Sequence, residues 1–314
     1  MKIVVTDAAT VTAGDISLEF LKKFGELTVY DDTEDSEIKE RIKDADMVLC
    51  NKTEIGEKEL SGSKVKYIGL FATGYNNIDV KYAAVNGITV CNVPGYSTEA
   101  VAQHTFALIL AAVNRVGEYN ETVKQGDWIK SKTFAYFPFP TAELCGKTIG
   151  IVGYGSIGRR VGDIARAFGM RVLAFSRHPF SENGVEYAEL DRIFGESDII
   201  TLHCPLNDDS RLMINSETIA KMKDGAVFIN TARGKLVDEY ALRDALISGK
   251  ISAAGLDVLT EEPMSRDCPL YLVKNCYITP HVAWAGLETR ERLMDVIEEN
   301  IKAYINNAPI NKVN

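Results

Sequence analysis

A glycine-rich turn between a short strand and a helix constrains the fold of this chain most. Residues Thr148–Val152 form an apolar run rich in β-branched side chains, which predicts a buried strand. Gly153, Gly155 and Gly158 follow with the spacing G-x-G-x-x-G, and residues 159–168 continue with helical apolar spacing. Strand, glycine turn and helix in this order predict a dinucleotide site whose phosphates lie at the helix N-terminus. An ordinary glycine-rich turn remains the alternative.

The end of the next strand indicates which dinucleotide to expect. Residues 171–175 form this strand, and Ser176, Arg177 and His178 follow it. NAD sites commonly place an acidic residue here, about 20 residues after the glycines, to bind the ribose 2′-hydroxyl. The hydroxyl of Ser176 and the guanidinium of Arg177 instead offer donors to a 2′-phosphate. We therefore expect NADP(H) as the cofactor, with NAD(H) as the alternative.

Composition excludes several classes of partner. The 314 residues favour about two domains, and the net charge is −9 with no basic block. Nucleic acid and an anionic membrane surface are therefore not expected as partners. The N-terminus has no signal-peptide pattern, and no apolar run approaches the ~20 residues that span a bilayer. The six cysteines are scattered without metal-ligand spacing, so we expect free thiols, no metal and a cytoplasmic location.

The first 97 residues alternate short apolar strands with amphipathic helices, which predicts a parallel sheet covered by helices on both faces. The expected strands are 2–6, 27–30, 47–50, 67–71 and 89–91, and the expected helices are 17–24, 35–42, 57–60 and 80–85. Loops at the carboxyl ends of such strands bind ligands. The loop 72–79 offers backbone N–H groups to an anion, although a plain turn capped by Asn77 or Asp79 explains it equally well.

A proline and a glycine within 92–96 predict a domain boundary. A strongly apolar helix is expected over 99–114, and the aromatic residues within 126–143 predict an ordered loop that covers another surface, such as a second subunit. Further strands are expected at 199–203, 226–230, 253–257 and 277–279. The final helix, 286–306, is expected to return to the first domain. The predicted domains are thus 1–97 plus 286–314 for substrate, and 98–285 for the dinucleotide.

Four chemically capable groups follow the expected strands of the second domain. Arg233, between Ala232 and Gly234, presents a planar guanidinium suited to a carboxylate. His281 can donate a proton near neutral pH. Asp257 and the turn Glu261-Glu262-Pro263 offer carboxylates that can keep such a histidine protonated and oriented. Taken one at a time, each residue has a structural or surface alternative.

Taken together, these motifs resemble the D-isomer-specific 2-hydroxyacid dehydrogenases along essentially the whole chain. The matching segments are residues 153–158, 230–234, 255–258 with Glu262-Pro263, and 279–281. Segments 98–105 and 280–284, together with Trp128 and the aromatic loop, are similar to the glycerate dehydrogenase (hydroxypyruvate reductase) group. The resemblance implies an α/β fold of two doubly wound parallel-sheet domains, with a Rossmann-type cofactor domain inserted into a flavodoxin-like substrate domain. It also implies a homodimer.

The resemblance further implies residue roles. Arg233 would hold the substrate carboxylate, His281 would protonate the forming alkoxide, and Glu262 would hydrogen-bond His281. The backbone of Thr73, Gly74 and Tyr75 would bind the carboxylate from the other domain, and Trp284 would enclose a small pocket. The expected cofactor contacts are Val101, Gly153, Tyr154, Gly155, Ser156, Ile157, Gly158, Ser176, Arg177, His203, Cys204, Pro205, Thr231, Ala232 and Asp257.

The activity that this resemblance implies is hydride transfer between NAD(P)H and a small 2-oxo acid, giving a D-2-hydroxy acid. Hydroxypyruvate is the expected substrate, and a glyoxylate reductase or a broad 2-oxo acid reductase is the alternative. A non-catalytic dinucleotide sensor is the alternative from another class, because a fold does not determine a function. Formate oxidation is disfavoured, since such relatives would carry glutamine in place of Glu262.

Overall fold

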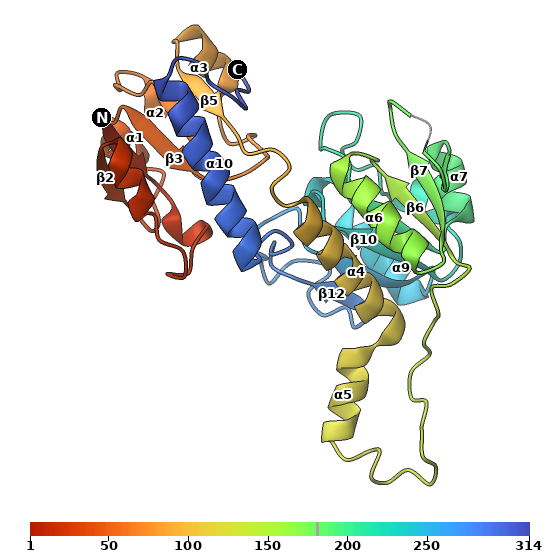
Figure 1. The fold of residues 1–314 in the computed structure, drawn as a ribbon. Coiled ribbons are helices and arrows are strands. Elements are labelled where there is room, and N and C mark those ends of the chain that lie inside the picture. The colour runs from red at the N-terminus through yellow and green to blue at the C-terminus, as the bar shows by residue number, and fades with distance from the viewer. Residues whose placement is uncertain (180–181) are drawn as a thin grey trace. The chain divides into compact units, whose positions relative to one another are not determined.

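The computed structural model describes residues 1–179 and 182–314. They divide into two compact units: unit 1 comprises Met1–Ser97 and Ala285–Asn314, and unit 2 comprises Thr98–Trp284 (Figure 1). Because unit 1 contains both ends of the chain, unit 2 is inserted into it. Each unit is built on its own parallel sheet, which confirms the expected α/β class with two doubly wound domains.

The sheet of unit 1 has the strand order β2-β1-β3-β4-β5 among the described residues, which is the flavodoxin-like order. Its two central strands, β3 and β4, are buried along their whole length, as their continuous apolar runs require. The chain reverses its direction of travel across the sheet between β1 and β3, where ligands bind in folds of this kind. The strands are β1 (Lys2–Val5), β2 (Glu26–Val29), β3 (Met47–Cys50), β4 (Tyr67–Leu70) and β5 (Thr89–Cys91).

Helices cover both faces of this sheet, and several are shorter than the sequence predicts. The segment expected as a helix from residue 17 is a 3₁₀ helix that begins at Glu19, and the one expected from residue 35 begins at Ile38. The long α10 packs against β4 and buries Leu293, Ile297 and Ile301. The helical elements are η1 (Ala8–Thr10), η2 (Glu19–Phe24), α1 (Ile38–Ile42), α2 (Glu57–Leu60), α3 (Val80–Val85) and α10 (Leu287–Ile305).

A buried carboxylate occupies the point between β1 and β3. Asp7 is only 3% exposed, and its oxygens accept hydrogen bonds from the backbone N–H groups of Asn51, Lys52 and Thr53 at 2.6–3.0 Å. The Thr53 hydroxyl donates to the same carboxylate at 3.0 Å. A buried charge is tolerated when it is hydrogen-bonded in this way. The Asp7 carboxylate therefore satisfies a set of backbone N–H groups of a kind that can bind an external anion.

We expect Asp7→Ala to destabilise the protein by about 3 kcal/mol or more, because several buried N–H groups lose a charged acceptor. Urea unfolding of the full chain measures this change. Asp44→Ala is the matched control, since Asp44 is an exposed residue paired with Lys64 and its loss should change stability little. Equal stability of the two variants would contradict the role given to Asp7.

The sheet of unit 2 has the order β12-β11-β10-β9-β6-β7-β8 among the described residues. Strand β6 pairs with both β7 and β9, so the chain switches direction at β6, as in Rossmann-type sheets. The strands are β6 (Thr148–Val152), β7 (Arg171–Phe175), β8 (Val185–Tyr187), β9 (Ile199–Leu202), β10 (Ala226–Asn230), β11 (Ile251–Leu256) and β12 (Cys276–Ile278). The sequence analysis missed β8, a three-residue strand at the edge of the sheet.

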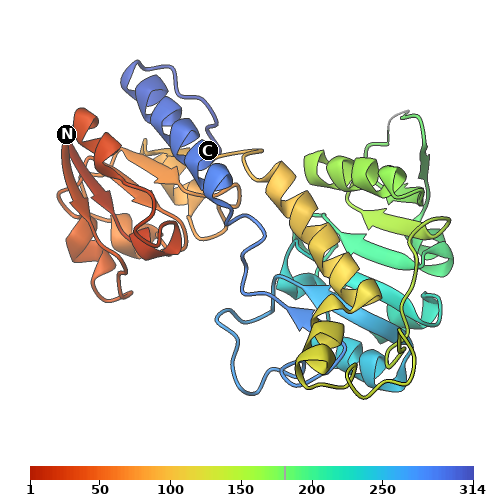
Figure 2. The same ribbon diagram turned by 60° about the horizontal axis from the view of Figure 1, so that its bottom comes forward.

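Two hydrophobic clusters flank this sheet. On one face α4 and α6 pack Phe106, Ile109 and Val161 against the strands, and Figure 2 shows these helices side by side. On the other face Phe194 and Leu242 lie in the cluster that includes α7 to α9. The helices are α4 (Thr98–Asn114), α5 (Val116–Lys124), α6 (Ser156–Ala167), α7 (Leu190–Glu196), α8 (Ser216–Lys221), η3 (Gly234–Leu236) and α9 (Glu239–Ser248). The apolar helix expected over 99–114 is α4.

The aromatic segment projects away from the rest of unit 2. Arg115 has a positive φ of 53° and separates α4 from α5, a helix that the sequence analysis did not predict. After α5 the chain runs without regular structure to β6 and returns along the body of the unit (Figure 1). Phe134 and Phe137 on this segment are 93% and 86% exposed, so within the described residues they cover no surface.

No helix in residues 1–179 and 182–314 has the length and the apolar character needed to cross a membrane.

Candidate active site

The glycine turn after β6 has the geometry of a nucleotide cradle. A Cβ on Gly153, which has a φ of +95°, would lie 2.5 Å from the backbone nitrogen of Cys204. A Cβ on Gly158 would lie 2.2 Å from the Gly153 carbonyl oxygen. At Gly155, by contrast, no described atom lies within 4 Å of such a Cβ. Two glycines thus permit close packing, and the third leaves space beside the N-terminus of α6 that fits a pyrophosphate.

Strand register places the ends of β6, β7 and β9 next to this cradle. Val152 is paired with Phe175 and with Leu202, so the residues that follow, Ser176 and His203, flank the turn. Arg177 and His178 are exposed beyond β7, and the hydroxyl of Ser176 accepts a hydrogen bond from the His178 N–H at 3.2 Å. The cofactor contacts expected at these strand ends therefore share one edge of the sheet.

His203 cannot act as a proton donor near neutral pH. Its backbone N–H donates to the Val152 carbonyl at 2.7 Å, and its Nε2 lies 3.0 Å from the Thr201 hydroxyl. Burial lowers the pKa of His203 to about 3. Beside it, burial raises the pKa of the Cys204 thiol to about 11, so this cysteine is not a thiolate. Both side chains are neutral at the expected nucleotide site.

The other half of the sheet carries the expected substrate chemistry. Asn230 is paired with Leu256, and Leu256 with Ile278, so Thr231, Asp257 and Thr279 follow the three strands side by side. The Asn230 side chain accepts from the Ala232 N–H at 3.0 Å and donates to the Arg233 carbonyl at 2.8 Å. This turn leaves Arg233 exposed.

The turn after Arg233 also requires a glycine. A Cβ on Gly234 would lie 1.9 Å from the carbonyl atoms of Leu259, so only glycine allows this approach. Because Gly234 lies this close to Leu259, the turn that contains Arg233 packs against the loop that carries Glu262.

Asp257 organises the turn that contains His281. Its side chain is 1% exposed, and its oxygens accept from the Thr279 hydroxyl at 2.6 Å and from the N–H groups of Val282 and Ala283 at 2.9 Å. Its carbonyl oxygen accepts from the His281 N–H at 2.9 Å. His281 has a left-handed φ of 54°, which is uncommon for a residue with a side chain. These bonds hold it there.

The His281 ring is oriented by Glu262. The His281 Nδ1 lies 2.6 Å from one Glu262 carboxylate oxygen, and the other oxygen accepts from the Leu259 N–H at 3.0 Å. An ionised carboxylate only accepts, so Nδ1 carries the hydrogen and Nε2 is directed away from Glu262. The Trp284 indole donates to the His281 carbonyl at 3.0 Å and so supports the same turn.

The remaining predicted residues, Thr73, Gly74 and Tyr75, follow β4 in unit 1. The Thr73 hydroxyl donates to the Val93 carbonyl at 2.7 Å, and the Asn92 side chain donates to the Thr73 carbonyl at 2.7 Å. Tyr75 is exposed. Further along the loop, Asp79 caps α3 by accepting from the Tyr82 N–H, as the plain-turn alternative expects.

The sequence analysis missed His104 and Thr105 on α4. The His104 Nε2 lies 2.8 Å from the Thr279 hydroxyl, and the Thr105 hydroxyl lies 3.1 Å from the Thr231 hydroxyl. Two adjacent polar residues inside a strongly apolar helix were the available signal. They connect α4 to two of the strand ends that carry the candidate chemistry.

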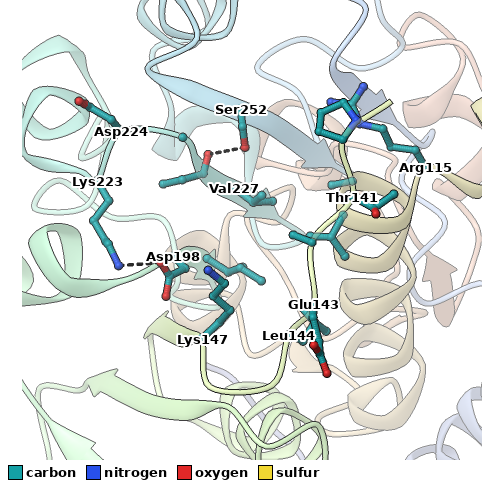
Figure 3. Close-up of a pocket in the computed structure, with 17 residues that line it drawn as sticks. Arg115, Thr141, Glu143, Leu144, Lys147, Asp198, Lys223, Asp224, Val227 and Ser252 are labelled. Atoms are coloured by element: carbon teal, nitrogen blue, oxygen red, sulfur yellow. Dashed lines mark hydrogen bonds and ion pairs between the residues drawn. The ribbon is translucent and has the colours of Figure 1, made fainter. Parts of the chain in front are cut away.

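A cavity of about 310 Å³ lies at the opposite edge of the sheet of unit 2 (Figure 3). Lys147, Asp198 and Val227 line it at the beginnings of their strands, and Lys223 pairs with Asp198 at 2.6 Å. Basic and acidic groups alternate around it. None of Arg233, Glu262 or His281 lines this cavity, so it is separate from the candidate site.

No group of three or more His, Cys, Asp or Glu residues in the described chain is arranged to hold a metal ion.

A glycine turn at the switch point, with Arg233, Glu262 and His281 at the same edge of the sheet, is the arrangement expected of a dinucleotide-dependent oxidoreductase of small acids. A family model described as the NAD binding domain of D-isomer specific 2-hydroxyacid dehydrogenases matches residues 106–283. The chain is 44% identical, over 100% of both sequences, to a hydroxypyruvate reductase from Blautia hydrogenotrophica. The chain belongs to the D-isomer-specific 2-hydroxyacid dehydrogenase family, which confirms the resemblance found in the sequence.

Two solved structures agree with this assignment. An acyclic imino acid reductase in complex with NADPH and D-Arg matches with a TM-score of 0.90 and 34% identity over 100% of both chains. A D-lactate dehydrogenase from Aquifex aeolicus, complexed with NAD and lactic acid, matches with a TM-score of 0.84 and 31% identity, over 98% of this chain and 96% of the other. The protein is thus an enzyme that uses a nicotinamide dinucleotide.

We expect the neutrality of His203 to make stability depend on pH. Its pKa is near 6.5 when unfolded and about 3 when folded, so its stabilising effect is complete above about pH 6.5 and is lost as the pH falls towards 3. Through this group the unfolding free energy should fall by about 2 kcal/mol between pH 7 and pH 5. Urea unfolding of wild type and His203→Gln measures this fall, which should disappear in the variant. The exposed-residue control His178→Gln should retain it; an unchanged pH dependence in both variants would refute the assignment.

Proposed function

We propose that this enzyme reduces a small 2-oxo acid to a D-2-hydroxy acid with NADPH, and that hydroxypyruvate, giving D-glycerate, is its best substrate. The observation that carries the proposal is the Glu262–His281 pair at the same sheet edge as the exposed Arg233. The full-length similarity to a hydroxypyruvate reductase supports the choice of substrate. Glyoxylate reduction, or reduction of a broader set of 2-oxo acids, is the nearest alternative.

The chain's own residues supply binding, orientation and a proton. When bound, the dinucleotide supplies a hydride to C2 of the substrate. The planar guanidinium of Arg233 holds the C1 carboxylate and polarises the C2 carbonyl. His281 donates its Nε2 proton to the oxygen that becomes the hydroxyl, while Glu262 keeps the ring oriented through Nδ1. Hydride and proton together account for the two hydrogens gained by the 2-oxo acid.

The division of roles between the two units is part of the same proposal. Unit 2 binds the dinucleotide at its glycine turn and carries Arg233, Glu262 and His281. For the loop Thr73–Tyr75 of unit 1 we propose that its backbone binds the substrate carboxylate. Trp284 limits the size of the group attached to C2, which favours short substrates.

We expect His281→Ala to lower kcat by about 100- to 10,000-fold, the usual contribution of a positioned proton donor. Arg233→Ala should raise KM for the 2-oxo acid and lower kcat as well, because the carboxylate loses its bidentate partner. Initial rates with hydroxypyruvate, glyoxylate and pyruvate measure both effects, and fluorescence titration should show NADPH binding near the wild-type level.

Arg243→Ala is the matched control, since Arg243 is an arginine of α9 bonded to Asp244 and should be dispensable. Variants that lose nucleotide binding in step with turnover would show that the roles are wrong. A wild type that binds nucleotide but turns over none of the acids would favour the dinucleotide sensor.

We also propose that NADPH is preferred to NADH, because Ser176 and Arg177 stand where an acidic residue would bind a ribose 2′-hydroxyl. An exposed arginine at the end of β7 can form charge-assisted hydrogen bonds with a 2′-phosphate. One similar structure contains NADPH and the other NAD, so this fold accommodates both dinucleotides.

We expect Arg177→Ala to raise KM for NADPH about tenfold or more, through loss of charge-assisted hydrogen bonds, and to leave KM for NADH nearly unchanged. Initial rates at low concentrations of each nucleotide measure the preference. Lys235→Ala, which removes an exposed cation beyond β10, serves as the control for net charge. Faster wild-type turnover with NADH, unaffected by Arg177→Ala, would disprove the preference.

The exposed aromatic segment and the family resemblance support two further proposals. We propose a homodimer in which Trp128, Phe134 and Phe137 contact a second copy, because large apolar side chains this exposed mark interaction sites. Measuring the molar mass of the protein in solution tests whether it is a homodimer. We also propose a cytoplasmic location, consistent with six cysteines that form no disulfide in the described chain.

A further inference from the structure

Two neighbouring side chains on α4 contact the strand ends that flank Asp257. His104 lies 2.8 Å from the Thr279 hydroxyl at the end of β12, and Thr105 lies 3.1 Å from the Thr231 hydroxyl at the end of β10. The helix that bears them is packed against β10, β11 and β12. A single rigid helix therefore contacts both the strand that leads to Arg233 and the strand that leads to His281.

The hydrogen-bond directions in this network are determined by Asp257. The Thr279 hydroxyl lies 2.6 Å from Asp257 Oδ1, and an ionised carboxylate only accepts. The single hydroxyl hydrogen therefore goes to Asp257. The Thr279 oxygen then accepts from His104, so the His104 Nε2 must carry a hydrogen. The chain of donation runs from His104 to Thr279 to Asp257.

Asp257 in turn holds the strained turn of the proton donor. The same Oδ1 accepts from the Val282 N–H, and Oδ2 accepts from the Ala283 N–H. His281 sits between these contacts with a φ of 54°, a conformation that persists only when its surroundings enforce it. The His104 ring is only partly exposed, with Nε2 3.5 Å from Asp257 Oδ1. Its Nε2–H dipole therefore lies beside a buried carboxylate.

We propose that His104 is a positioning residue for proton transfer: its Nε2–H orients the Thr279 hydroxyl towards Asp257, and Asp257 thereby fixes the turn that presents His281. His104 touches neither substrate nor cofactor in this role. The inference rests on the proposed role of His281 and adds a requirement: residue 104 must donate a hydrogen bond.

Variants at residue 104 separate donation from packing. Gln places an amide N–H near the position of Nε2, whereas Leu fills similar space without a donor. His104→Leu should lower kcat for the 2-oxo acid about 10- to 100-fold, the effect of losing a hydrogen bond within a charged network. His104→Gln should remain within about threefold of wild type, a change of under 1 kcal/mol. KM for NADPH should change less than twofold in both variants, because His104 is not one of the expected nucleotide contacts.

Variants of Thr279, whose hydroxyl contacts His104, provide an independent test. Thr279→Val removes the hydroxyl with little change of shape, and Thr279→Ser retains it. Thr279→Val should lower kcat about as much as His104→Leu does. Thr279→Ser should keep most of the wild-type kcat. In a double-mutant cycle, His104→Leu should cause no further loss in the Thr279→Val background, because the bond is already absent. If His104→Leu does not fold, the Val and Ser variants decide the question.

Gln103→Leu is the control for placing an apolar residue on this turn of α4, since Gln103 is exposed. Its rates should equal those of wild type. Equal losses in the Gln and Leu variants of His104, additive losses in the cycle, or a rise of KM for NADPH in step with the fall of kcat would each overturn the inference. Wild type is assayed first: if it turns over no 2-oxo acid, the proposed function fails and the inference fails with it. If wild type is active, only the comparison of variants bears on His104.

Discussion

The chemistry of this enzyme depends on in-register parallel pairing. Because Asn230, Leu256 and Ile278 are aligned across β10, β11 and β12, the next residue of each strand emerges at the same edge. The candidate side chains there come from loops far apart in the sequence, and the register of the strands brings the starts of these loops together. The same rule brings the ends of β6, β7 and β9 around the glycine turn. One sheet thereby offers a nucleotide half and a reaction half.

Buried carboxylates then make these loops rigid. Asp7 in unit 1 and Asp257 in unit 2 are nearly inaccessible, and each is surrounded by backbone N–H groups and a threonine hydroxyl. Several charged hydrogen bonds offset the cost of burying each anion. A chain with a net charge of −9 can bind a substrate anion where a cation is local and exposed, and Arg233 is the exposed cation that we propose for this role.

Local patterns in the sequence were sufficient to predict most of the sheet and part of the candidate site. Strands such as β6 and β10 are buried apolar runs, and Gly153, Gly155 and Gly158 have a fixed spacing. The start of η2, the presence of α5 and the short edge strand β8 depend on tertiary context, which local propensity does not record. Asp7 and His104 were missed for the same reason: Asp7 contacts residues more than 40 positions away, and His104 contacts a residue 175 positions away.

The strand register and the buried carboxylate Asp257 both help to fix the position of His281. A left-handed residue is strained, and a strained residue moves unless several bonds oppose it. The backbone of His281 is held by Asp257 and its ring by Glu262, so the two carboxylates constrain different degrees of freedom. The proposed proton transfer needs both constraints, because a correctly oriented ring on a shifted backbone still misplaces Nε2. The related imino acid reductase and D-lactate dehydrogenase structures share this fold. A shared fold therefore does not by itself determine which substrate each of these proteins takes.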